Sequence, residues 1–195
     1  MFAEDEPGSW TGRDVGPFRL GPFLENDRYG EVYLVEGDTS TVIKVIHPGI
    51  GTQRAQTGNF EADLEAAAGI QHPDLARCNK YDLDNEPRFA AWDHLDGAVT
   101  LEDLIAEGGP LPETAAYLAI SRIAGALAPL HAQRVFHRNL NPASITISGV
   151  NQQILRTDPE AMLRASIRVR YWAEAHLVRT KDPIAAHQKN PKGFF

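Results

Sequence analysis

The side chains best suited to chemistry in this sequence include one short polar segment, His137-Arg138-Asn139-Leu140-Asn141. It follows a long helical pattern, so these residues are expected in a loop at the end of a helix. An imidazole, a guanidinium and two carboxamides can all form hydrogen bonds. A carboxamide carries no charge, however, and is not a useful base near neutral pH. The segment therefore lacks a carboxylate that could accept a proton.

A second candidate is Lys44, which lies in the β-branched run Thr41 to Ile46, a pattern that predicts a strand. A partly buried lysine needs an anionic partner. The next predicted element is a helix from Asn59 to Ile70.

The surrounding elements that must position these residues are predicted from hydrophobic periodicity and turn residues. The first part contains a hairpin over 18–33 that turns at 25–28, the strand 41–46, the helix 59–70, and an antiparallel pair over 76–81 and 88–92. The second part contains helices over 101–107 and 113–133, a short strand over 145–147, and a final helix from Thr157 to about Arg179. The expected fold class is α+β with two lobes, a five-stranded antiparallel sheet with one helix and then a reduced helical half.

Three segments in order resemble a bacterial-type serine/threonine protein kinase: Tyr29-Gly-Glu-Val-Tyr33, Val42-Ile-Lys44, and the stretch from Leu130 to Pro142. The resemblance covers about residues 18–150 and implies a protein kinase-like fold. It divides the chain into a flexible leader (1–17), an N-lobe (18–95), a truncated helical C-lobe (96–180) and a flexible tail (181–195).

The resemblance also implies which positions would do phosphoryl transfer, and most of them are altered. Asn139 stands at the position of the catalytic aspartate, Asn141 at that of the phosphate-steadying lysine, and Ser144 at that of a magnesium-binding asparagine. No catalytic residue is therefore expected. By the same resemblance, Lys44 stands at the position of the lysine that contacts phosphate, and Asp63 stands at that of its helix partner. We favour a Lys44–Asp63 pair that only orients the helix, and the alternative is a lysine that contacts phosphate. Lys44, Asp63, Gly30 and Val32 remain as vestiges of a nucleotide site.

The glycine-rich loop and the adenine pocket also differ from those of a working kinase. Glu25 and Asp27 stand where two glycines would let backbone amides approach phosphates, although these residues also suit an ordinary hairpin turn, which we favour. Bulkier or polar residues occupy the expected adenine pocket and predict a filled cleft: Val42, Trp92 and Thr146.

Asp158-Pro159-Glu160 falls near the position expected for the magnesium-binding Asp-Phe-Gly. Asp158 is therefore a candidate metal ligand. The same residues also suit a helix start, with Asp as the cap and Pro in the first turn, and we favour this second interpretation.

The composition narrows the class of protein. The net charge of −7 is split between an acidic segment, residues 1–150, with 11 basic and 22 acidic residues, and a basic segment, residues 151–195, with 8 and 4. An acidic body argues against nucleic-acid binding. One cysteine, an acidic N-terminus and no long apolar run predict a soluble cytoplasmic protein that does not bind membranes.

These observations favour a catalytically inactive kinase-like domain, a pseudokinase that acts as a protein-binding or regulatory module without a cofactor. The rival hypothesis is a divergent kinase or ATPase that binds Mg-ATP through Lys44 and Asp158. A third possibility is that the chain is part of a longer protein.

Overall fold

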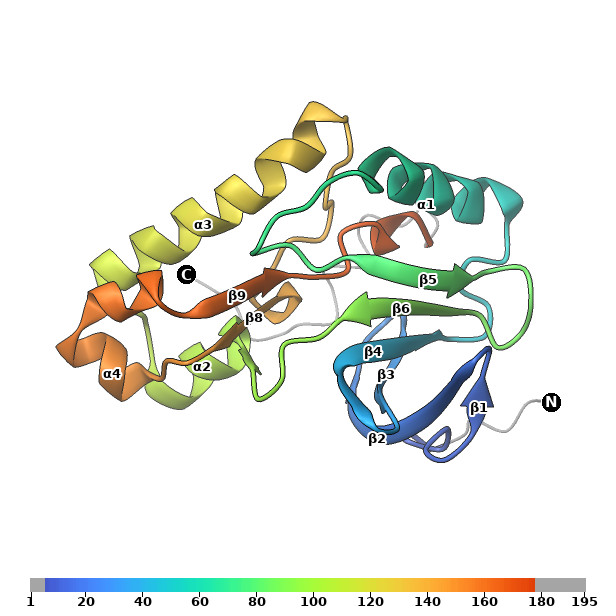
Figure 1. Cartoon of the computed structure of the whole chain (residues 1–195), viewed down its shortest axis with the longest axis horizontal. Coiled ribbons are helices and arrows are strands. Elements are labelled where there is room, and N and C mark those ends of the chain that lie inside the picture. The colour runs from blue at the N-terminus through green and yellow to red at the C-terminus, as the bar shows by residue number, and fades with distance from the viewer. Residues whose placement is uncertain (1–5, 178–195) are drawn as a thin grey trace.

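The computed structural model describes residues 6–177. Its first half is a curled antiparallel sheet of six strands in the order β1-β2-β3-β4-β6-β5, covered by one helix (Figure 1). The strands and the helix are β1 (Asp14–Val15), β2 (Phe18–Asn26), β3 (Gly30–Val35), β4 (Asp38–Ile46), β5 (Cys78–Asp82), β6 (Phe89–Asp93) and α1 (Arg54–Ala67).

The strand β4 lies inside this sheet and is covered on both faces. Ile43 and Val45 pack into a small cluster with Leu20 and Phe89, whereas Val42 belongs to the main core beneath α1. Burial on both faces explains why this strand is an almost continuous β-branched run rather than an alternating one.

The predicted flexible leader, residues 1–17, is wrong for the part that the structure describes. Asp14 and Val15 form β1, and Val15 is fully buried. Trp10 packs against the same cluster, and the Gly8 amide donates to Glu31. The polar and glycine-rich composition concealed these anchors because only two apolar side chains in the segment, Trp10 and Val15, carry the packing.

The second half contains the long helix α3 and a three-stranded antiparallel sheet in the order β7-β8-β9. Its elements are β7 (Val99–Thr100), α2 (Leu101–Gly108), α3 (Glu113–Ala132), η1 (Pro142–Ser144), β8 (Ile145–Ser148), α4 (Gln152–Thr157), η2 (Pro159–Leu163), β9 (Ser166–Val169) and η3 (Glu174–Leu177). Within the described residues, no helix is long and apolar enough to cross a membrane.

The final helix predicted from Thr157 to about Arg179 is also wrong over its described part. The chain instead forms η2, the strand β9 and the short η3. In β9, Ile167 and Val169 are fully buried and Arg168 lies between them, a period-two pattern that pairs with β8. The spacing of the arginines is also typical of an amphipathic helix. The alternation of Ile167 and Val169 with polar residues instead forms a strand, because β8 is available to pair with it. The tail predicted over 181–195 lies outside the described residues.

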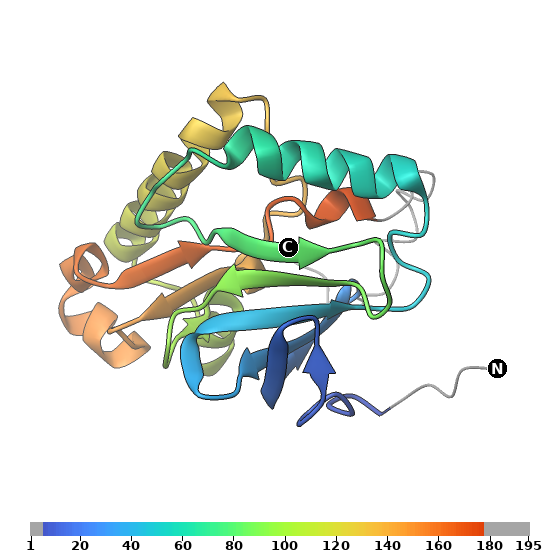
Figure 2. The same cartoon turned by 45° about the vertical axis from the view of Figure 1, so that its right-hand side comes forward.

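After β9 the chain returns toward the first half. Residues 170–177, here called the strap, lie between α1 and β5 (Figures 1 and 2). Trp172 anchors the strap because its indole Nε1 donates a 2.8 Å hydrogen bond to the Ala76 carbonyl. Trp92 of β6 meets both Tyr171 and Trp172 edge to face. The strap therefore joins the two halves through aromatic packing.

Candidate functional site

The centre of the site is Lys44 on β4, whose side chain is completely buried. Its Nζ lies 2.6 Å from Asp27 Oδ2 and 2.6 Å from Glu174 Oε2. Burial opposes the charged form, but the two carboxylates outweigh it and raise the pKa of Lys44. The lysine is thus a charged ion-pair partner that water does not reach.

The predicted Lys44–Asp63 pair is wrong. Asp63 Oδ2 instead contacts Arg138 Nη1 at 3.2 Å and His176 Nε2 at 2.7 Å. The strap explains why Lys44 and Asp63 have other partners, because it brings Glu174 to Lys44 and His176 to α1. Asp63 still orients α1, but toward the strap and the polar loop rather than toward β4.

Asp27 combines two functions in the turn between β2 and β3. Its Oδ1 accepts hydrogen bonds from the backbone amides of Tyr29, at 2.8 Å, and Gly30, at 3.1 Å, while Oδ2 binds Lys44. One carboxylate therefore occupies donors of the kind that bind a phosphate in a glycine-rich loop.

Backbone packing alone requires a glycine at position 30. A Cβ atom at this position would lie 2.2 Å from the Val45 carbonyl oxygen on the neighbouring strand. A side chain would therefore push β3 away from β4. The glycine is explained by this close approach without any reference to phosphate.

Glu25, the other acidic residue at an expected glycine position, is also bound within the protein. Its carboxylate contacts Arg170 Nη1 at 2.8 Å and Nη2 at 2.9 Å, and it accepts a 3.0 Å hydrogen bond from the Tyr171 hydroxyl. Arg170 also donates to the Ala143 carbonyl. Glu25 thus ties the edge of the first sheet to the strap and to the loop before β8.

Tyr171 lies between Lys44 of β4 and the segment that ends at Ser144. Lys44 Nζ is 4.1 Å from its ring centroid, and its neighbour Arg170 is bonded through the backbone amide to Ser144. Its backbone is left-handed, with φ of 62°. Burial raises the pKa of its phenol well above the ordinary value, so the group stays neutral and unlike the carboxylates that Mg²⁺ prefers.

Asp158, the candidate metal ligand of the sequence, lies elsewhere. It joins α4 to η2, at the end of the molecule away from β4 (Figures 1 and 2). Its carboxylate pairs with Arg164. Asp158 does stand at the start of η2 with Pro159 next, as the helix-start interpretation predicts, but its side chain forms no cap hydrogen bond.

The polar loop at 137–141 is held by its own hydrogen bonds. His137 is buried, and its Nε2 lies 3.1 Å from the Arg170 carbonyl; burial lowers the pKa of this imidazole. Asn141 caps η1: its Oδ1 accepts from the Ser144 amide, and Ser144 Oγ donates to the Asn141 carbonyl. The Asn139 carbonyl accepts from Asn141 Nδ2. The Asn141 carboxamide therefore braces the loop.

The side chains expected around a nucleotide are tightly packed. Val32 and Val42 are at most 2% exposed, and Trp92 is fully buried against Tyr171 and Trp172. Thr146, on β8, is 6% exposed. The strap thus covers Trp92, and the other two side chains expected in an adenine pocket, Val42 and Thr146, are buried as well.

Two central residues, Tyr171 and Glu174, escaped the sequence reasoning. Both lie in the run Tyr171-Trp-Ala-Glu-Ala, where a single acid stands among apolar neighbours. Such an isolated acid suggests a buried partner, and this was the available signal. Among residues 6–177, no group of three or more His, Cys, Asp or Glu side chains is arranged to hold a metal ion.

The chain is similar to known serine/threonine kinases in sequence and to a kinase domain in fold. No protein-family model matches the chain. It is 26% identical over 136 residues to the serine/threonine-protein kinase pkn2 of Myxococcus xanthus, covering 68% of this chain and 16% of that protein. It is 26% identical over 141 residues to PknD of Mycobacterium tuberculosis, covering 71% of this chain and 21% of that protein.

The fold itself matches the crystal structure of the PknI kinase domain of Mycobacterium tuberculosis. The TM-score is 0.64 at 19% identity, over 87% of this chain and 63% of that domain. The chain thus spans only part of each protein that it matches. It has a protein kinase-like fold and belongs to the protein kinase-like superfamily, as a distant homologue of bacterial serine/threonine kinases over 68–71% of its length.

Proposed function

We propose that this kinase-like domain is a pseudokinase, which performs no phosphoryl transfer and acts as a protein-binding or regulatory module. The observation that carries the proposal is the engagement of Lys44 and of the Tyr29 and Gly30 amides by the protein's own carboxylates. Groups that would hold a polyphosphate are already neutralised by Asp27 and Glu174.

The residues present do not fit Mg-ATP, the cofactor that the fold family implies. A triphosphate beside Lys44 would face three carboxylates, those of Glu25, Asp27 and Glu174, and like charges at such short range repel strongly. Tyr171 offers a neutral phenol instead of a carboxylate for the metal. The domain is therefore proposed to work without nucleotide.

The residues at the position of the catalytic loop also support the proposal that the domain transfers no phosphate. Asn139 cannot accept the proton of a substrate hydroxyl near neutral pH. Asn141 and Ser144 are hydrogen-bonded to each other, so both have structural roles. The loop therefore keeps a hydrogen-bonded conformation but lacks a catalytic base. This combination suits a domain that binds a protein partner through its surface.

Nucleotide binding is tested by thermal melting with ATP and a non-hydrolysable analogue, each with and without magnesium. We expect no change in Tm beyond about 1 °C, because a ligand stabilises only in proportion to its binding to the folded state. A rise of several degrees with Mg-ATP would contradict the proposal and favour the rival kinase or ATPase. Loss of that rise in Asp158→Ala would assign the metal to Asp158.

Restoring the missing base should not restore catalysis. We expect Asn139→Asp and the unmodified chain to show equal, background transfer of radiolabelled phosphate to generic protein substrates. The reason is that a base adds little where phosphates and metal are not held. Asn141→Ala is the matched control for disturbance of the loop. Transfer that rises by tenfold or more in Asn139→Asp alone would show that the cleft does admit nucleotide.

A further inference from the structure

Glu174 is the most enclosed acidic side chain of the cleft. Its side chain is 2% exposed, whereas those of Asp27 and Glu25 are 41% and 31% exposed. Its Oε2 binds Lys44, but its Oε1 is buried and has no hydrogen-bond partner in the part of the chain that the structure describes. Half of this carboxyl group is therefore left without the contacts that a buried charge requires.

The charges around Glu174 do not balance. Lys44 on β4 and Arg170 on the strap are the cations, while Asp27 and Glu25 are the other carboxylates. Within residues 6–177, two cations thus face three carboxylates. The remaining groups that face Glu174 are neutral: Tyr29, Tyr171 and the Cys78 thiol of β5. On α1, which packs against the strap, Asp63 is engaged by His176 and Arg138.

The excess negative charge falls on Glu174 because water can still reach the other two carboxylates. Burial raises the pKa of Glu174 to about 7, although Lys44 pulls it down. If the strap lifted, Glu174 would meet water and return toward its ordinary value of 4.5. The closed cleft therefore binds a proton that the open one releases near neutral pH.

We propose that Glu174 is a proton-operated latch, in which a proton on its carboxyl group keeps the strap closed over Lys44 and loss of that proton loosens the strap. The latch rests on the packing and charge count of the closed cleft. It does not depend on whether the domain transfers phosphate, so its failure and the failure of the proposed function are distinguishable.

The direction of the pH effect follows from linkage. Below about pH 4.5 Glu174 is protonated in both states, so opening does not vary with pH. Between about pH 4.5 and 7 the open state loses its proton first, and the opening constant rises up to about tenfold per pH unit. Above about pH 7 both states are ionised and the opening constant levels off at its highest value. Acidification from neutral pH therefore tightens the strap.

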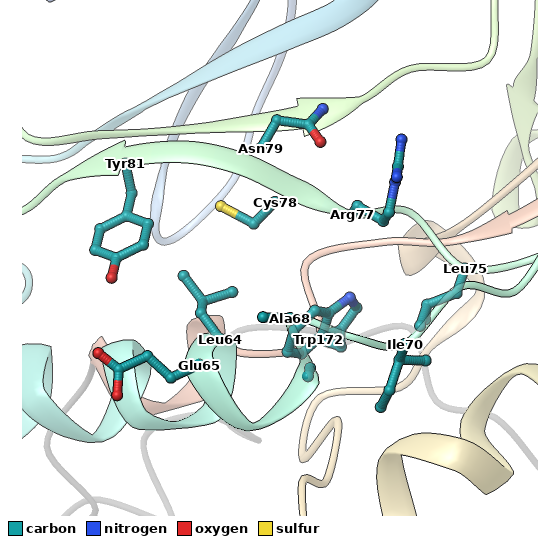
Figure 3. Close-up of a pocket in the computed structure, with 11 residues that line it drawn as sticks. Leu64, Glu65, Ala68, Ile70, Leu75, Arg77, Cys78, Asn79, Tyr81 and Trp172 are labelled. Carbon is teal, nitrogen blue, oxygen red and sulfur yellow. The ribbon is translucent and has the colours of Figure 1, made fainter.

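Opening would expose an apolar surface as well as Lys44. Trp172 of the strap forms one wall of a cavity of about 380 Å³ between α1 and β5, which Ala68 and Cys78 also line (Figure 3). Withdrawal of Trp172 would remove one wall of this cavity. Opening of the strap would thus raise the exposure of the half-buried Cys78 and of the apolar residues around it.

The test is hydrogen exchange of the full chain, followed by mass spectrometry of peptides that cover residues 170–177. Protection is expressed relative to an unfolded reference, because the chemical exchange rate itself varies with pH. In the wild-type protein we expect protection of the strap to fall by up to about tenfold per unit between about pH 5 and 7 and then to level off. In Glu174→Gln, which mimics the protonated group, protection should stay constant over this range.

Two further variants isolate the effect. Glu65→Gln removes a carboxylate that lines the same cavity without contacting Lys44, and His176→Gln removes the neighbouring imidazole of the strap, which pairs with Asp63. Both should keep the wild-type slope. A flat wild-type profile, or an equal slope in Glu174→Gln, would overturn the latch. If Glu174→Gln does not fold, infrared titration of the wild-type carboxyl band provides the test, with a midpoint near pH 7 expected and one near 4.5 contradicting the proposal.

Discussion

Replacing Lys44 with methionine is expected to lower the free energy of unfolding by about 3–5 kcal/mol at pH 8, the usual result of removing one partner of a buried ion pair. Methionine keeps most of the apolar volume of the side chain, so the loss reports the charge. Without the ammonium group, the buried Glu174 carboxyl has no cation at its Oε2 and must either take up a proton or stay charged and unpaired, and both cost stability at pH 8. Denaturant unfolding followed by tryptophan fluorescence measures the change.

Two comparisons make this result specific. Lys80→Met changes an exposed lysine on β5 and should cost no more than about 0.5 kcal/mol. The double variant Lys44→Met/Glu174→Gln should be less destabilised than Lys44→Met alone, because it removes the orphaned carboxylate together with its partner. A loss below about 1 kcal/mol for Lys44→Met would show that the buried pair does not support the closed cleft.

Replacing Trp172 with alanine is expected to cost about 3–5 kcal/mol, in the range for a large aromatic side chain removed from a core. The indole is 3% exposed, packs edge to face on Trp92 and donates to the Ala76 carbonyl. Its loss would leave a cavity and an unpaired carbonyl at the point where the strap crosses β5. Equilibrium unfolding again provides the measurement.

The conservative variant separates packing from hydrogen bonding. Trp172→Phe keeps a ring but removes the N–H, so we expect about 1–3 kcal/mol of destabilisation. Tyr117→Ala on the open face of α3, where the tyrosine is 70% exposed, is the control and should be nearly neutral. Modification of the Cys78 thiol should become faster in Trp172→Ala. An unchanged rate would mean that the indole does not shield this cavity.

The parts of the fold that were predicted correctly are those stabilised by local patterns. Three predicted elements carry their pattern within a short stretch of sequence, and each is present in the structure. They are the β-branched strand at 41–46, the helix over 113–133 and the antiparallel pair over 76–81 and 88–92. The errors fall where a few residues act through distant contacts. Trp10 and Val15 anchor the supposed leader, and β9 becomes a strand because β8 is there to pair with it.

In the candidate site, too, the features that depend on residue type were predicted correctly, whereas those that depend on distant contacts were not. That Asn139 cannot act as a base is a property of its residue type, so the sequence alone determined it. The acidic character of the turn at Glu25 and Asp27 was equally plain. The partner of Lys44 was not, because Glu174 lies 130 residues away along the chain and reaches the lysine only through the strap. Nothing in the spacing favoured Glu174 over Asp63.

The sequence by itself therefore determined the fold class and the loss of specific chemical groups, since these depend on local periodicity and on side-chain type. Only the tertiary structure decided how the cleft is closed: which carboxylate neutralises Lys44, where Tyr171 lies, and that Asp158 is remote from both. The physical reason is that burial and charge pairing are set by the positions of all neighbouring groups. Those positions exist only once the strap has folded back between α1 and β5.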